Sequence, residues 1–332
     1  EESDRLSVSL DKETTRHLRN IRCICGDLLA ALPAQWVSTR HKGRRAHILW
    51  ELTNLQNRAS RLEKHSGLIC WTGQRDMDTA LCAIPKNLDE LLWRDFWNKG
   101  IPAVLTSGTL SAAKDFSRVK QSLGLHRLPP AYVKEAYKPS PFNHALNTLV
   151  YISRAAPFPD NQSRAYLEAV ADEVERLVRA SHGHAAVLFT SYKSMDMVRE
   201  MLENRALPFP LFQMRKGDAN AIGRFKQSGN GVLFASGALW EGIDIPGDAL
   251  SMLIVVRLPF AVPDPISQHE RTLYPDMAAY KAGVVVPDML VKLKQGAGRL
   301  SRTETDSGVV ALLDSRARED GQYHRQVLRA LP

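Results

Sequence analysis

The chain has 332 residues, of which 44% are hydrophobic and 24% charged, a composition typical of a globular protein with a buried core. Its formal net charge of +8 favours a polyanionic partner. No apolar run approaches the roughly 18 residues of a membrane span, and the charged first residues lack the apolar core of a signal peptide. This pattern argues against membrane association and predicts a cytoplasmic protein.

Two amphipathic stretches come first in the chain. Apolar residues recur at helical spacing over residues 14–32 and again over residues 44–65. Pro33 and the basic stretch 40–45 separate these stretches, which predicts an antiparallel helical pair. Two short apolar runs joined by a polar segment then predict a β-hairpin, with strands over residues 68–71 and 79–84.

The chain has four cysteines, Cys23, Cys25, Cys70 and Cys82. A Cys-x-Cys pair followed by two isolated cysteines does not have the spacing of an iron–sulfur cluster. We therefore expect buried free thiols in a reducing compartment, with no metal site and no iron–sulfur cluster.

The next segment mixes short elements. Helices are predicted over residues 88–97 and 115–125. Between them, a short strand is predicted over residues 103–105, directly before the polar run Thr106 to Thr109. Two proline-rich stretches then place a domain boundary between residues 126 and 145.

From there the chain alternates between two patterns. Nearly continuous apolar runs are typical of parallel strands that are covered on both faces, and they occupy residues 148–152, 186–190, 231–235, 252–256 and 309–313. Helical patterns occupy residues 163–181, 194–205, 218–227, 265–281 and 287–303. This alternation predicts a doubly wound α/β sheet over residues 137–332.

Polar residues follow directly after the predicted strands. They are Thr190 to Tyr192, Ser236 to Asp244, Arg257 to Phe260, and Asp314 to Arg316. Because the carboxyl ends of parallel strands share one edge of a sheet, and ligands of open α/β sheets bind at that edge, these residues are predicted to line a single site.

A glycine-containing basic segment adds a second candidate site. Gln295, Arg299 and Arg302 recur at steps of four and three, so they share one face if the segment is helical. Guanidinium groups form forked hydrogen bonds that suit phosphate oxygens. On this segment alone, a solvated basic helix is an equally good interpretation.

Seven motifs resemble, in order and spacing, the DinG/XPD-type DNA helicases of superfamily 2. They are LTSGTLS (105–111), SPFN (140–143), VLFTSY (187–192), LWEGIDIPG (239–247), LPF (258–260), QGAGRLSR (295–302) and LLDSR (312–316). The ATP-binding G-x-x-x-x-G-K-[ST] loop of such enzymes is absent, since the chain has no Gly-Lys dipeptide. The acidic motif that follows this loop in the family is not found either, since no Asp-Glu pair of the chain has a His after it.

The resemblance implies the C-terminal portion of an ATP-dependent DNA helicase. Residues 1–66 resemble part of a helical arch, residues 67–136 the end of the first motor lobe with a connecting segment, and residues 137–332 a RecA-like second lobe. It further implies ATP and Mg²⁺ as cofactors, bound mainly by the missing first lobe, and a role in DNA repair. This polypeptide alone is predicted to be inactive.

Roles for individual residues follow from the same resemblance. Arg299 and Arg302 are predicted to be arginine fingers, and Gln295, Asp244, Glu241 and Gly242 to bind the nucleotide. Contacts to single-stranded or forked DNA are assigned to Thr190, Ser191, Tyr192, Lys193, Thr106, Ser107 and Thr109. A monomer is expected, with no membrane partner.

Two other functions compete with this interpretation. One is a nucleic-acid-binding or interaction module without a motor, although retention of both Arg299 and Arg302 argues against it. The other is a helicase-linked nuclease whose nuclease domain lies outside this chain. A longer open reading frame upstream would discriminate among the three.

Overall fold

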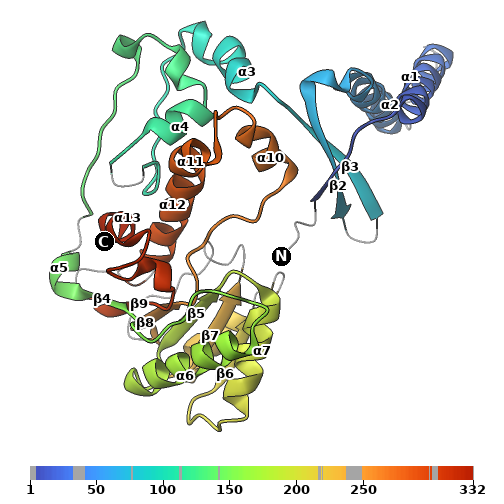
Figure 1. Ribbon diagram of the computed structural model, residues 1–332. Helices are drawn as coiled ribbons and strands as arrows, with labels where there is room; N and C mark the ends of the chain where they lie inside the picture. The colour runs from blue at the N-terminus through green and yellow to red at the C-terminus, as the bar shows by residue number, and fades with distance from the viewer. Residues whose placement is uncertain are drawn as a thin grey trace. The chain divides into compact units, whose positions relative to one another are not determined.

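The structure is a computed structural model (Figure 1). It describes residues 5–32, 42–75, 78–111, 114–140, 143–215, 218, 220–236, 249–298, 300 and 306–331. The chain divides into two compact units, which are treated separately below. The first comprises Glu1–Ile101, Ser122–Leu128 and Val262–Met277, and the second Pro102–Gln121, Pro129–Ala261 and Ala278–Pro332.

The first unit contains a packed helical pair, α1 (Lys12–Ala31) and α2 (Lys42–Glu63). Helix α1 begins after Asp11, whose carboxylate accepts a hydrogen bond from the Thr14 amide at 2.7 Å. Arg19 and Arg22 of α1 both bind Glu63 of α2, at 2.8 and 2.9 Å. The two predicted helices are thus confirmed, each to within about two residues at its ends, which is the usual uncertainty of helix boundaries.

A three-stranded antiparallel sheet, of order β1-β2-β3, completes much of this unit. Its strands are β1 (Arg5–Ser7), β2 (Leu68–Arg75) and β3 (Asp78–Pro85). The predicted hairpin is confirmed, while β1 was missed because three exposed residues carry no periodic signal. The unit also contains the helices α3 (Leu88–Asp95) and α10 (Pro265–Arg271) and the short 3-10 helices His65–Gly67, Trp97–Lys99 and Leu125–Arg127.

The second unit is built on a six-stranded parallel sheet of order β4-β9-β8-β5-β7-β6. Its strands are β4 (Thr148–Ile152), β5 (Ala185–Phe189), β6 (Leu211–Met214), β7 (Val232–Ser236), β8 (Met252–Val255) and β9 (Gly308–Leu312). Five of these confirm predicted strands to within one residue. The fold is the predicted doubly wound α/β lobe.

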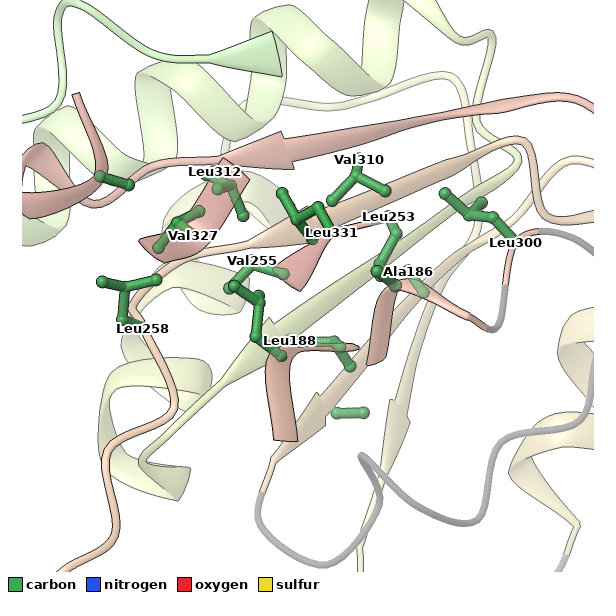
Figure 2. Close-up of a cluster of buried hydrophobic side chains, with 14 of the residues drawn as sticks. Ala186, Leu188, Leu253, Val255, Leu258, Leu300, Val310, Leu312, Val327 and Leu331 are labelled. Atoms are coloured by element: carbon green, nitrogen blue, oxygen red, sulfur yellow. The ribbon is translucent and has the colours of Figure 1, made fainter. Parts of the chain in front are cut away.

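Helices cover both faces of this sheet. Helices α6 (Arg164–Ala180) and α7 (Tyr192–Glu203) bury one face, in a cluster that includes Val174, Val198 and Ile254. The opposite face is covered by α8 (Ala221–Ser228), α12 (Val286–Ala297) and α13 (His324–Ala330). Figure 2 shows this second cluster, in which Leu188, Val255 and Leu312 of adjacent strands meet Val327 and Leu331.

Shorter elements connect these layers. They are the helices α4 (Ser117–Ser122), α5 (His144–Asn147) and α11 (Met277–Tyr280), the π-helical turn Lys281–Val285, and the 3-10 helices Pro130–Tyr132 and Ser315–Ala317. Helix α4 is shorter than the predicted helix over residues 115–125.

Two sequence predictions are wrong here. The helix predicted over residues 265–281 is interrupted between α10 and α11, where Pro275 has no amide hydrogen to continue a helix. The strand predicted over residues 103–105 is absent, because no strand among the described residues pairs with it, and Val104 is 90% exposed. The division of the chain at residues 66 and 136 into family domains stays a prediction.

Candidate functional site

Polar residues gather at the carboxyl edge of the parallel sheet. Ser153 follows β4, Asp314 follows β9, Arg257 follows β8, Ser191 follows β5 and Ser236 ends β7. Of these, the three serines and Asp314 are buried. The strand order therefore brings together residues that are widely separated in the sequence, as the sequence pattern predicted.

Asp314 joins two of the strand exits. It is fully buried, and its Oδ2 accepts a hydrogen bond from the Leu258 amide at 2.8 Å. Its carboxylate also accepts from the backbone amide of Arg316 at 3.0 Å and from the Arg316 guanidinium at 2.9 and 2.6 Å. Because a buried charge is costly without a partner, these contacts explain why a carboxylate is tolerated at this position.

The Arg316 guanidinium lies over an aromatic ring as well. Its Cζ is 4.8 Å from the ring centroid of Phe260, whose ring packs 5.2 Å from that of Tyr323. The motifs LPF and LLDSR therefore pack against each other at the sheet edge, where the buried Asp314 binds the half-buried Arg316. The sequence placed both motifs at this edge and gave no sign of this contact.

Tyr166, in the first turn of α6, is a residue that the sequence reasoning missed. Its hydroxyl is buried and has no hydrogen-bond partner among the residues that the structure describes. Burial raises the pKa of Tyr166, and the Asp314 carboxylate raises it further, while Arg257 and Arg316 act in the opposite direction. The hydroxyl therefore keeps its proton and can donate a hydrogen bond. Its spacing in the sequence is that of an ordinary core residue of α6.

The four residues at the exit of β5 are differently exposed. Ser191 is buried and caps α7, since its hydroxyl accepts from the Ser194 amide at 3.3 Å. Thr190 is partly exposed, while Tyr192 and Lys193 are exposed. The Tyr192 ring lies 6.0 Å from the Arg215 guanidinium, which Asp196 holds at 2.7 and 2.8 Å.

Gln295 and Thr109, both predicted site residues, are in contact. Gln295 Nε2 donates a hydrogen bond to Thr109 Oγ1 at 3.1 Å. Thr106 and Ser107 are exposed, and the Ser107 hydroxyl accepts from the Thr109 amide at 3.2 Å. Lys294 precedes Gln295 in α12. The Nζ atoms of Lys294 and Lys114 lie 5.7 and 5.3 Å from the ring centroid of Tyr137.

Comparison with known proteins identifies the lobe. Residues 174–332 match the model of a helicase C-terminal domain. The chain is 29% identical over 248 residues to the probable ATP-dependent helicase YpvA of Bacillus subtilis, covering 73% of this chain and 36% of that protein. It is 29% identical over 254 residues to the ATP-dependent helicase DinG of Mycobacterium tuberculosis, covering 75% and 38%. In fold it is similar to an XPD helicase structure, with a TM-score of 0.60 at 17% identity, covering 98% and 56%.

The chain is similar to the DinG/XPD-type helicases. It corresponds to their C-terminal portion and spans about a third of the length of the curated relatives it matches, 36% and 38% for the two above.

Five predicted site residues lie outside the described residues: Arg299, Arg302, Glu241, Gly242 and Asp244. Helix α12 ends at Ala297 with Gly298 as its C-cap, so it is shorter than the helix predicted over residues 287–303. Leu300 follows, with its side chain buried in the core.

Neither metal sites nor membrane spans are found in the described part of this chain. No group of three or more histidine, cysteine or acidic side chains could hold a metal ion there. The expected buried thiols are confirmed for Cys25 and Cys70, whereas Cys82 is only half-buried and Cys23 is exposed on α1. Among the described helices, none is both long and apolar enough to cross a bilayer.

Proposed function

We propose that the full-length protein is an ATP-dependent DNA helicase, in which these residues supply the arginine half of the ATP site and part of a single-strand track. The observation that carries the proposal is the gathering of polar motif residues at one edge of the doubly wound sheet, in a chain that matches a helicase C-terminal domain. The alternation of buried strands and covering helices fixes that edge, and the residues that follow β4, β5, β8 and β9 lie along it.

Arg299 and Arg302 neutralise the charge that develops on the transferring phosphoryl group. A mobile arginine supplied across a cleft contributes about 10³–10⁵-fold in rate. Gln295 engages the nucleotide from the end of α12, and Glu241, Gly242 and Asp244 shape the facing loop. ATP and Mg²⁺ are held mainly by a first motor lobe, because this sequence has no Gly-Lys dipeptide and therefore no phosphate-binding loop of its own. By itself the chain then hydrolyses no ATP.

The strand track uses the exposed residues of two segments. Tyr192 and Lys193 at the start of α7 offer one ring and one ammonium group, and Thr190 a hydroxyl. Thr106, Ser107 and Thr109 contribute hydroxyls from the second segment. Ser191 acts indirectly, because its hydroxyl already caps α7. The partner is single-stranded or forked DNA, and the net charge of +8 is consistent with a polyanion.

The test is steady-state ATP hydrolysis by the full-length protein. Arg299→Ala and Arg302→Ala should each lower kcat at least about 10²-fold, with a smaller effect on ATP binding, because the lost interaction forms mainly in the transition state. Arg299→Lys should not restore the rate, since a point charge lacks the forked geometry. Arg179→Ala, which removes an arginine paired with Glu175 near the end of α6, serves as the control.

Binding of single-stranded DNA decides between this role and the simpler one. At fixed salt, the affinity of Arg299→Ala should match that of the wild type. If the substitution instead weakened DNA binding and flattened its salt dependence, the segment would be a basic contact to the phosphate backbone.

A further inference from the structure

The loop between β4 and α6 presents one exposed aromatic ring on an anchored backbone. Phe158 is 69% exposed, although Ala156 and Pro159 beside it are buried. The Ala156 amide donates to the buried Ser153 hydroxyl at 3.2 Å, and the Ser153 amide donates to Leu312 of the neighbouring strand at 2.9 Å. Prolines on both sides of Phe158 fix two further backbone angles. The Phe158 ring is therefore exposed to solvent on a loop whose backbone is held in place.

One face of this ring is covered by a cation that is itself held in place. The Arg316 Cζ lies 5.9 Å from the Phe158 ring centroid and 4.8 Å from that of Phe260. Arg316 cannot easily leave, because the buried Asp314 binds it through two hydrogen bonds at 2.9 and 2.6 Å. Arg318 adds a hydrogen bond to the Arg154 carbonyl of the same loop at 3.2 Å. Phe158 is thus positioned by residues that the site at the sheet edge already contains.

The loop lies at the carboxyl edge of the sheet, the edge that carries the Thr190–Lys193 part of the proposed strand track. Strands β9 and β8 separate β4 from β5, so the two strand exits are three strand spacings, roughly 14 Å, apart. A few nucleotides span that distance. The two segments that meet at the ring carry Arg154, Arg316 and Arg318, while Asp314 and Asp320 pair with the last two and Asp160 adds a further acidic side chain.

We infer that Phe158 is a stacking platform for an unpaired base of single-stranded DNA, a contact that rests on the proposed function and extends its strand track. Aromatic rings stack on any base, so such a platform binds without sequence preference. The guanidinium behind the ring faces the electron-rich side of the aromatic system, and the neighbouring arginines suit the phosphates on either side of the base.

The experiment measures binding of a fluorescent single-stranded oligonucleotide to the full-length protein at fixed salt. Phe158→Ala should weaken binding about tenfold, within the range measured for loss of one base–aromatic stack. Phe158→Trp should bind at least as tightly as wild type, because a larger ring stacks equally well. The matched control is Tyr132→Ala, which removes an equally accessible ring, 79% exposed, from the same unit and should leave affinity unchanged.

A second readout separates stacking from a structural role. An oligonucleotide of abasic sites has the same phosphates without bases, so wild type should bind it more weakly than normal DNA, and Phe158→Ala should discriminate less. Equal binding of normal DNA by Phe158→Ala and wild type would overturn the inference and leave the proposed function intact. If the wild type showed no salt-dependent DNA binding, both the inference and the proposed function would be overturned. If Phe158→Ala lost affinity for ATP but not for DNA, the ring would belong to the nucleotide site, and this result would also overturn the inference.

Discussion

Gln295 near the end of α12 donates a hydrogen bond to Thr109, a residue 186 positions earlier in the chain. A second tie between the same segments lies at the start of the helix, where Arg118 of α4 binds Asp288 through two hydrogen bonds of 2.9 Å. Helix α12 is therefore held near both ends by the segment that carries the motif LTSGTLS. The effects of substitutions at Gln295 and Thr109 on stability should therefore depend on each other.

The first prediction measures this coupling with a double-mutant cycle. Gln295→Ala and Thr109→Val each remove one partner of this hydrogen bond. The double variant should therefore lose less unfolding free energy than the sum of the losses in the two single variants. The expected coupling is about 0.5–1.5 kcal/mol in the free energy of unfolding, the range for one hydrogen bond. Urea unfolding supplies the three differences. Gln295→Ala combined with the distant Lys226→Ala should be additive, and additivity of the Gln295–Thr109 pair as well would show that the contact carries no energy.

The second prediction concerns the buried carboxylate at the sheet edge. Asp314→Ala leaves the Arg316 guanidinium and the Leu258 amide without their shared acceptor, so it should destabilise the protein by about 3–5 kcal/mol. The control is Asp320→Asn, because Asp320 is 74% exposed and its pairing with Arg318 should be worth less than about 1 kcal/mol. Thermal and urea unfolding would both report the difference. Similar values for the two variants would mean that Asp314 is solvated in solution.

The strands could be predicted from the sequence where burial on both faces leaves an uninterrupted apolar run, as at Val187 and Ile254. The same apolar signal missed one real strand and predicted one strand that does not form. Strand β6 was missed because a short edge strand of three half-buried residues and one buried methionine, beside prolines, looks like a loop. The run at Val104 was assigned to a strand because the sequence pattern records hydrophobicity and not the presence of a partner strand.

The candidate site was predictable to the extent that it follows from topology. Parallel strands share an edge, so residues after strands, such as Asp314 and Arg257, had to lie together. The contacts of Arg316 with Phe260 and Phe158 depend on how three loops pack, and no periodicity encodes that. Tyr166 was missed because a buried tyrosine in a helix has the spacing of a core residue whatever its hydroxyl contacts.

The third prediction uses Glu173 of α6, which binds Tyr151 at 2.7 Å and Arg176 at 2.6 Å. Burial alone would raise the pKa of Glu173, but hydrogen bonds from Arg176, Tyr151 and Ser153 outweigh it and hold the pKa below its ordinary value of 4.5. Because the folded pKa lies below the unfolded one, the carboxylate contributes stability above about pH 4.5 that is lost as the pH falls through the folded value.

Glu173→Gln should therefore lower the free energy of unfolding at pH 7 by about 1–3 kcal/mol and flatten its decline below pH 4.5. Unfolding by urea at a series of pH values provides the measurement. Glu168→Gln, at an exposed ion pair with Arg164, should change stability by less than about 1 kcal/mol. An unchanged acid limb in Glu173→Gln would count against the lowered pKa.

The last prediction compares two exposed lysines at opposite edges of the same sheet. Lys193 lies in the first turn of α7, at the carboxyl edge, while Lys226 lies near the end of α8, where the chain returns to the amino edge before β7. If single-stranded DNA follows the carboxyl edge, Lys193→Ala should weaken binding and reduce the slope of log affinity against log salt by about 0.7, the release expected for one phosphate contact. Lys226→Ala removes the same charge and should leave the slope unchanged, because the residues proposed to contact DNA after β5 lie at the opposite edge. Affinities measured at several salt concentrations for both variants give the slopes. Equal losses from both lysines would mean that DNA binding reflects overall charge and that the track is misplaced.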